Sequence, residues 1–96
     1  MTRPDEVKVV LTAAAEVWGV SEEDILSHRR FADMVCARHF SMWALWKMGR
    51  TLQSVGDVFG VKHGTVWHAL EVLERRSEDE KRYREKLELF CRKVWG

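Results

Sequence analysis

The stretch that decides the fold is TLQSVGDVFGVKHGTVWHAL, residues 51–70, which predicts a helix, a tight turn and a second helix. Thr51 supplies the hydroxyl that an N-cap uses to accept from the free N–H groups of the first turn. Gly60 suits the left-handed residue that ends many helices. The apolar residues between them repeat at helical spacing and form one stripe: Leu52, Val55, Val58 and Phe59.

The second helix is expected to begin near His63, after the short turn Val61-Lys62. Gly56 permits another backbone segment or a side chain to approach closely. The inward side of the second helix is predicted to consist of Val66, Ala69, Leu70 and Leu73. Two short helices joined by such a turn form a helix-turn-helix, whose second helix can enter the DNA major groove. The same hairpin also occurs as plain core scaffolding, and the periodicity alone leaves both interpretations open.

The length and composition predict one small domain over residues 1–96. The chain has 46% hydrophobic residues and two cysteines. The two cysteines are too few for a disulfide framework, so a cytoplasmic location is expected. No apolar run approaches the roughly 20 residues that span a bilayer, so no membrane partner is expected. Helical periodicity throughout predicts an all-α fold, a compact helical bundle that contains the helix-turn-helix.

The net charge of +1 hides an uneven distribution of charge along the chain. Residues 1–27 carry a net charge of −4, residues 28–70 carry +4 and residues 71–96 carry +1. The positive segment also contains all four histidines. Because a charged partner responds to the local potential, this distribution is compatible with binding to nucleic acid.

Further helices are predicted on both sides of this stretch. Thr2, Pro4 and Asp5 suit the start of a first helix that ends at Gly19. A capping box at residues 21–24 precedes a short helix, and residues 31–48 predict a long buried one. The expected features of the last helix are a capping box over residues 77–80, the pairs Glu78–Arg82 and Glu80–Arg84, and a stripe formed by Tyr83, Leu87, Phe90 and Val94.

Catalytic and metal sites are not indicated by the sequence. Cys36 and His39 lie three residues apart on a predicted helix, but a structural zinc site needs four ligands. His63 and His68 lie five residues apart on another predicted helix and point in different directions, so they do not form a metal site. No G-x-x-x-x-G-K-[ST] loop occurs, which excludes ATP-driven opening of DNA by this chain. We therefore expect no enzyme activity, no cofactor and no small-molecule substrate.

Residues 54–69, SVGDVFGVKHGTVWHA, resemble the signature of the C-terminal DNA-binding domain of the bacterial replication initiator DnaA. That signature runs roughly I-G-x-x-F-G-x-R-D-H-T-T-V-x-H-A. The matching positions are Val55-Gly56, Phe59-Gly60, His63, Thr65-Val66 and His68-Ala69. The resemblance covers most of residues 7–75 and implies a Trp-repressor-like helix-turn-helix that binds double-stranded DNA.

This sequence departs from the family pattern in the turn and at the start of the second helix. The turn is one residue shorter, Lys62 stands at the family's acidic base-reading position, and Gly64 replaces its first threonine. The loop at Gly49-Arg50 is also one residue shorter. The resemblance therefore implies the fold but not the DNA sequence that is read.

The resemblance also implies the roles of individual residues. Arg30 would enter the minor groove; His63 and Thr65 would approach base edges or phosphates. Contacts to the DNA backbone would come from Arg38, Arg50 and Lys62, although Arg38 can also be an ordinary surface charge. Trp67 would touch a thymine methyl group or pack on Arg29-Arg30; alternatively it seals the edge of the core. The expected DNA-binding residues are Arg30, Arg38, Arg50, Lys62, His63, Gly64, Thr65 and Trp67.

The expected biological role is that of a free-standing DnaA-like regulator of replication or transcription. The start at Met1 and the N-terminal helix favour this over a fragment of a longer initiator. A replication initiator or another replication protein is a further expected partner. The alternative is a protein-interaction module that kept the fold and lost DNA binding, which the shortened turn and Gly64 would favour.

Overall fold

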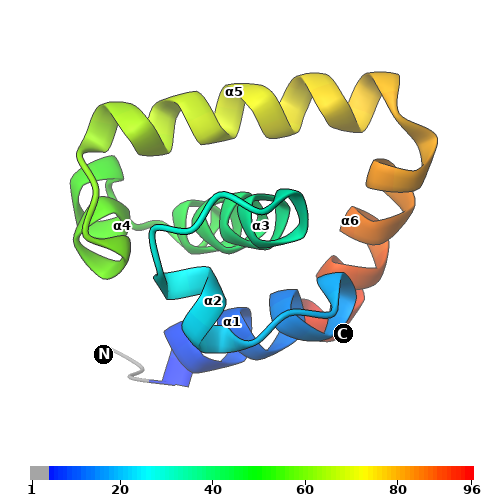
Figure 1. Cartoon of the computed structure of the whole chain (residues 1–96), viewed down its shortest axis with the longest axis horizontal. Helices are drawn as coiled ribbons and strands as arrows, with labels where there is room; N and C mark the ends of the chain where they lie inside the picture. Colours follow the sequence, from blue (N-terminus) through cyan, green and yellow to red (C-terminus); the bar gives the residue numbers. More distant parts are fainter. Residues whose placement is uncertain (1–4) are drawn as a thin grey trace.

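The computed structural model describes residues 5–96, and all regular elements in that range are α-helices. The predicted all-α class is therefore confirmed (Figure 1). The helices are α1 (Asp5–Trp18), α2 (Glu22–Leu26), α3 (Ala32–Lys47), α4 (Leu52–Phe59), α5 (His63–Asp79) and α6 (Lys81–Trp95). The predicted helix start at Thr2 and Pro4 lies outside the described residues.

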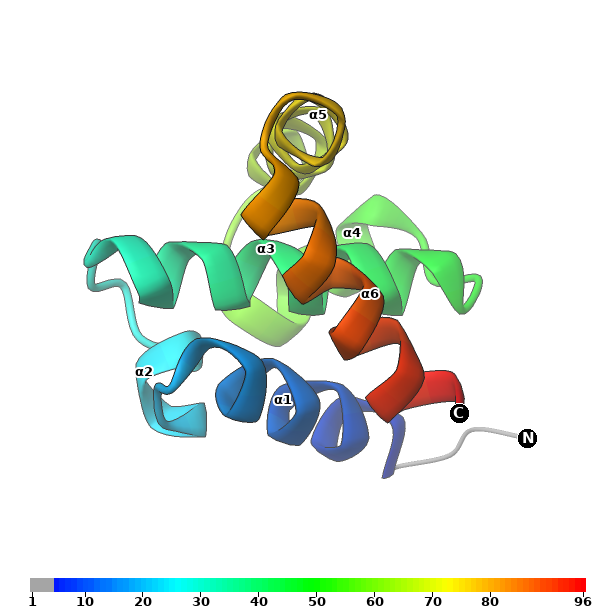
Figure 2. The same ribbon diagram turned by 90° about the vertical axis from the view of Figure 1, so that its right-hand side faces the viewer.

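Helix α3 forms the centre of the molecule, with α1, α5 and α6 arranged around it (Figures 1 and 2). Phe40, near the middle of α3, has no exposed surface. Its ring centroid lies 5.2 Å from that of Trp18 in α1, and 5.1 Å and 5.3 Å from those of Tyr83 and Phe90 in α6. This aromatic cluster joins the first and last helices to the centre, which positions α5 across the top of the bundle.

The predicted helix boundaries around the helix-turn-helix are confirmed by their caps. Thr51 accepts a hydrogen bond from the backbone N–H of Ser54 at 3.0 Å, and α4 ends at Gly60 with φ of 67°. The capping box of α2 is also present, since the Ser21 hydroxyl and the Asp24 carboxylate each accept from the other's backbone N–H. These local bonds fix where each helix begins before any tertiary packing is considered.

Gly56 is the position where the backbone of the turn comes closest to α4. Its carbonyl accepts the N–H of Val61 at 2.9 Å, and an ideal Cβ at Gly56 would lie 2.5 Å from the Val61 carbonyl oxygen. A backbone atom cannot rotate away as a flexible side chain can. Only a glycine therefore allows the turn to close against α4 in this way.

Gly56→Ala is expected to destabilise the protein by about 1–3 kcal/mol, because the added methyl group forces α4 and the turn apart. Gly64→Ala is the matched control, since a Cβ there meets no heavy atom within 4 Å. That second substitution should raise stability by about 0.5–1 kcal/mol through helix propensity. Urea denaturation of both variants measures the two effects, and equal effects at the two glycines would contradict the close approach.

The predicted capping box over residues 77–80 is wrong, because α5 continues through these residues to Asp79. The Ser77 hydroxyl donates to the Glu74 carbonyl within α5, and α6 begins after Glu80 without a side-chain cap. Glu80 instead pairs with Arg76 at 2.8 Å, and the expected partner Arg84 donates to the carbonyls of Ser77 and Glu78. The expected pairs Glu78–Arg82 and Glu80–Arg84 do not form among the described residues.

A tertiary contact explains this difference. The Arg76 guanidinium lies 4.3 Å from the centre of the Tyr83 ring and donates to the Cys36 sulfur at 3.1 Å. It is thereby held where Glu80, four residues further on, can reach it. The stripe predicted for α6 is confirmed, since Tyr83 and Phe90 are buried and Leu87 and Val94 pack against the core.

Candidate nucleic-acid interface

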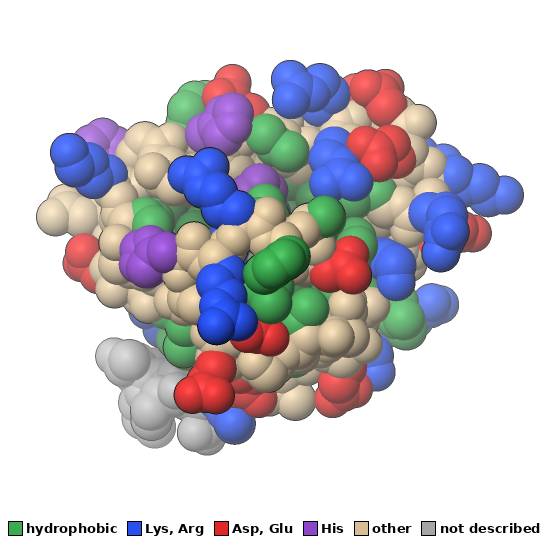
Figure 3. All heavy atoms as spheres, viewed as in Figure 1, with side chains coloured by type: hydrophobic (Ala, Val, Ile, Leu, Met, Phe, Trp, Pro, Cys, Tyr) green, Lys and Arg blue, Asp and Glu red, His purple; other side chains and the backbone are tan. Residues whose placement is uncertain are grey.

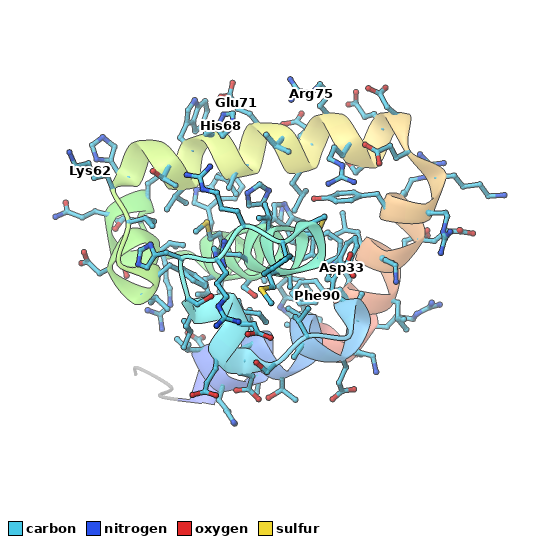
Figure 4. All side chains as sticks on the ribbon, viewed as in Figure 1. Asp33, Lys62, His68, Glu71, Arg75 and Phe90 are labelled. Carbon is cyan, nitrogen blue, oxygen red and sulfur yellow. The ribbon has the colours of Figure 1, made fainter. Side chains whose placement is uncertain are left out.

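Helix α5 presents one side to the core and the opposite side to solvent. Its predicted inward residues are all buried: Val66, Ala69, Leu70 and Leu73. On a helix with 3.6 residues per turn, His68 and Arg75 are turned about 180° from this stripe. Figure 4 shows Lys62 at the start of α5 and His68, Glu71 and Arg75 along its length. The first turns of α5 are therefore accessible to a large partner.

A groove of about 290 Å³ separates the start of α5 from the connection between α2 and α3. We call the connection His28–Arg30 the basic elbow and the groove the elbow groove. Its walls include His28 and Arg30 of the elbow, Val35 and Arg38 of α3, and Thr65 and His68 of α5. Histidine and basic side chains gather over this part of the surface in Figure 3. Three of the predicted DNA-binding residues, Arg30, Arg38 and Thr65, thus surround one concave site.

Arg38 holds the basic elbow in place. Its guanidinium donates to the carbonyl of Ile25 at 2.7 Å and to those of Asp24 and Arg29 at 3.1 Å each. These bonds satisfy carbonyls at the end of α2 and tie the elbow to α3. Burial, followed by the nearby charge of Arg30, lowers the pKa of Arg38. Both guanidinium groups line the elbow groove, where they concentrate positive potential.

The residues at the tip of the helix-turn-helix are exposed and make no side-chain hydrogen bond to a described residue. They are Lys62, His63, Gly64 and Thr65. Helix α5 has no side-chain cap, unlike α2 and α4. The backbone N–H groups of His63 and Gly64 have no acceptor among the described residues and remain available to an anion at the positive end of the helix dipole, whereas the N–H of Thr65 donates to the Lys62 carbonyl at 3.0 Å.

Comparison with known proteins places this arrangement in a family. The sequence model described as "Bacterial dnaA protein helix-turn-helix" matches residues 7–72, which include the elbow, α3, α4 and the first half of α5. The chain belongs to this DnaA family. The resemblance predicted from residues 54–69 is therefore confirmed.

Relatives named "Chromosomal replication initiator protein DnaA" match most of the chain. The protein from Pseudothermotoga lettingae is 36% identical over 66 residues, which is 68% of this chain and 15% of that protein. The one from Thermodesulfovibrio yellowstonii is 27% identical over 98% of this chain and 22% of its own length. The one from Caulobacter vibrioides is 33% identical over 88% and 18%. The chain spans less than a quarter of the length of these DnaA proteins.

Arg50, which was predicted to contact the DNA backbone, lies away from the elbow groove. Arg50 approaches Glu6 of α1 at 3.4 Å, and its side chain is only 23% exposed. The loop that carries Arg50 follows the far end of α3 from the basic elbow. Arg50 therefore pairs within the chain with Glu6, and this ion pair argues against a contact between Arg50 and DNA.

Trp67 lies on the side of α5 opposite the basic elbow. It lines a second groove together with Trp43 and Trp46 of α3, and 53% of its surface is exposed. The expectation that it packs against Arg29-Arg30 is wrong. Val66 faces the core and Thr65 faces the elbow groove. Because successive residues of a helix are turned by about 100°, Trp67 points to the side of α5 opposite Thr65.

His28 and His68 line the elbow groove but were not among the predicted site residues. The helical spacing of His68 relative to Val66 indicated an outward position, although nothing indicated what it would face. His39 also lines the groove, at its base between α3 and α5. Burial, followed by the charges of His68, Arg38 and Arg76, lowers the pKa of His39 to about 4.

His39 should make the free energy of unfolding depend on pH. Its ordinary pKa of 6.5 applies in the unfolded chain, which therefore binds the proton more tightly than the folded chain does. The contribution of His39 to the free energy of unfolding is fully present above pH 6.5. It is lost as the pH is lowered towards 4, by at most about 1.4 kcal/mol per pH unit. His39→Gln should remove this part of the dependence in urea denaturation between pH 7.5 and 4, a range that includes both pKa values.

An identical dependence in the wild type and His39→Gln would show that His39 is not held neutral by burial.

Residues 5–96 contain neither a membrane-spanning helix nor a cluster of three or more potential metal ligands. No helix in this range is long and apolar enough to cross a membrane. No group of three or more His, Cys, Asp or Glu side chains in the described part of the chain could hold a metal ion. Cys36 and His39, the pair considered from the sequence, therefore have no additional ligand among these residues.

Proposed function

We propose that this chain binds double-stranded DNA, with the start of α5 in the major groove and Arg30 in the adjacent minor groove. The observation that carries the proposal is the elbow groove, where Arg30, Arg38 and Thr65 meet beside the start of the second helix of a helix-turn-helix. Membership of the DnaA helix-turn-helix family supports it. A positively charged concave surface next to a protruding helix fits the alternation of groove and phosphate backbone in DNA.

The proposed contacts divide into those that read bases and those that hold the backbone. His63 and Thr65 approach base edges from the first turn of α5, where Gly64 leaves space for the DNA. Lys62 and the free N–H groups of α5 bind phosphates. Arg38 holds the elbow and offers Nη1, which has no described hydrogen-bond partner, to a phosphate in the elbow groove.

Beyond its first two turns, α5 is not suited to contact phosphates. Glu71, Glu74 and Glu78 are exposed and follow one another at helical spacing, so they form an acidic stripe. Phosphates near this stripe would be repelled. The DNA must therefore leave α5 soon after His68, which restricts base reading to a short segment. A thymine contact by Trp67 stays a prediction. The side chain lies on the acidic side of α5, where repulsion of the phosphates opposes such a contact.

Arg30→Ala is expected to weaken binding by about tenfold at duplexes with A·T-rich flanks, equivalent to about 1.4 kcal/mol. A narrow minor groove concentrates negative potential, so the loss should be smaller with G·C-rich flanks. Arg38→Ala should weaken binding to all duplexes about equally, since phosphate contacts carry no base information. Fluorescence anisotropy with the two sets of duplexes measures both effects.

The melting temperature of each variant serves as the control, because Arg38 also supports the elbow and its loss should lower stability. Equal losses for the two variants on every duplex would mean that Arg30 contacts only the backbone, and would exclude the minor-groove role.

The finer role that we propose is that of a DnaA-like regulator of replication or transcription, with a replication protein as a further partner. A second candidate function is a protein-interaction module without DNA binding, which the exposed tryptophan side chains beside α5 favour. Titration with random-sequence duplex at low salt distinguishes the two functions, since only the first predicts binding.

A further inference from the structure

A second groove lies on the other side of α5, between α5 and the C-terminal half of α3. In Figure 2 this half of α3 extends away from α2 and passes below α5. The groove has a volume of about 380 Å³, and Leu70, Leu73 and Leu87 contribute to its lining. Two tryptophans on its walls, Trp46 and Trp67, are 41% and 53% exposed. We call this site the tryptophan groove.

The tryptophan groove has the composition of a protein interface. An apolar centre with exposed aromatic side chains is typical of the buried core of homodimer interfaces, and charged residues are typical of their rim. Exposed tryptophans are costly in a monomer, because each can bury about 200 Å² of surface. Trp43 extends the apolar surface, since its ring lies 5.9 Å from that of Trp95 in α6. Such a surface indicates a partner rather than ordinary solvent exposure.

The charges on the two walls are opposite in sign. Lys47 lies on the α3 wall, whereas Glu71 and Glu74 lie on the α5 wall. None of the three forms an ion pair with another described residue. The acidic wall argues against a nucleic acid as the occupant, because phosphates would be repelled there. A two-fold axis that runs through the groove, in contrast, can pair the basic wall of one copy with the acidic wall of another.

We propose that a second copy of this chain covers the tryptophan groove in a two-fold symmetric dimer. Trp46 and Trp67 of each copy enter the groove of the other, and Lys47 of each copy faces Glu71 and Glu74 of its partner. The elbow groove lies on the opposite side of α5 and remains accessible in this dimer. The proposal goes beyond DNA binding and does not depend on it.

The expected dimer is weak. About half of each of four tryptophans would become buried, which amounts to roughly 400 Å² at about 200 Å² for each side chain. The leucines and the charged rim add to this area, but stable interfaces commonly bury about 1,200–2,000 Å². Association should therefore depend on concentration, with the mass rising towards twice the 11.3 kDa of the chain.

Sedimentation equilibrium of the purified chain, from about 1 µM to 1 mM, tests the proposal across the affinities expected of a weak interface. The wild type should dimerise within this range, and Trp46→Ala should weaken dimerisation at least tenfold. Leu26→Ala is the matched control, because Leu26 is equally exposed at 41% but lies on α2. Circular dichroism checks that the variants are folded. A wild type that stays monomeric throughout overturns the proposal, as does a dimer that Trp46→Ala leaves unchanged.

Charge reversal tests the orientation of the two copies. Lys47→Glu and the double variant Glu71→Lys/Glu74→Lys should each fail to self-associate, since like charges then face each other across the two-fold axis. An equimolar mixture of these two variants should restore dimerisation, because every facing pair again has opposite charges. Failure of the mixture to associate, or self-association of either variant as tight as that of the wild type, overturns the proposed pairing. Neither result depends on whether the chain binds DNA.

Discussion

Phe40→Ala is expected to lower the free energy of unfolding by about 3–5 kcal/mol, the range found when a buried aromatic side chain is removed. Phe40 has no exposed surface and contacts the rings of Trp18, Tyr83 and Phe90. Its removal leaves a cavity between three helices whose backbones are fixed by other contacts, so the cavity cannot close easily. Chemical denaturation monitored by circular dichroism measures the loss.

Phe31→Ala is the control for this experiment, because Phe31 is 67% exposed at the start of α3. Its removal should change the free energy of unfolding by no more than about 0.5 kcal/mol, as expected of a surface substitution. Similar losses at the two phenylalanines would contradict the position of α3 at the centre of the core.

The helix-turn-helix could be predicted from the sequence because its signals are local. The cap at Thr51, the left-handed residue Gly60 and the close approach at Gly56 each depend on residues within a few positions. The inward stripe of α5 follows directly from its period of 3.6 residues. The central position of α3 was also predictable, since its sequence between Phe40 and Trp46 is apolar on nearly all sides.

The junction of α5 and α6 could not be predicted, because its outcome depends on a contact between distant residues. The sequence of residues 77–80 satisfies the local rule for a capping box. Arg76, however, is held by Cys36, forty positions earlier, and draws Glu80 into an ion pair. The spacing of residues along α5 and α6 carries no information about a contact with a residue of α3.

The sequence indicated which segment contains the candidate site. It indicated only in part how the side chains of that site are arranged. The excess of positive charge in residues 28–70 indicated the right segment. It did not show that Arg50 turns towards Glu6, or that Arg38 donates hydrogen bonds to carbonyls of α2 and of the basic elbow. The direction of Trp67 follows from helical spacing, but its neighbours Trp43 and Trp46 come from another helix. Which residues a helix faces is a tertiary property.

Affinity for duplex DNA is expected to fall by about 150-fold between 50 and 200 mM salt, which corresponds to a log–log slope near −3.6 for about four neutralised phosphates. The number four follows from the net charge of +4 that residues 28–70 carry, a segment that includes Arg30 and Arg38 at the elbow groove and Lys62 at the start of α5. Each phosphate contact releases condensed counterions, so salt opposes binding in proportion to the number of contacts. Lys62→Ala should reduce the magnitude of the slope by about 0.9.

Arg92→Ala is the control for the salt experiment, since Arg92 is an exposed cation on α6. Its substitution should leave the slope unchanged, because α6 is not part of the proposed DNA interface. A smaller slope in both variants would indicate a diffuse effect of net charge rather than contacts at the start of α5.

The measurement that tests DNA binding by this helix-turn-helix most directly is the salt dependence of wild-type affinity for a random-sequence duplex, followed by fluorescence anisotropy. We expect clear binding at 50 mM salt and a log–log slope near −3.6, as for about four phosphate contacts. No binding at 50 mM salt, or an affinity that stays constant as the salt concentration rises, would contradict the proposed function.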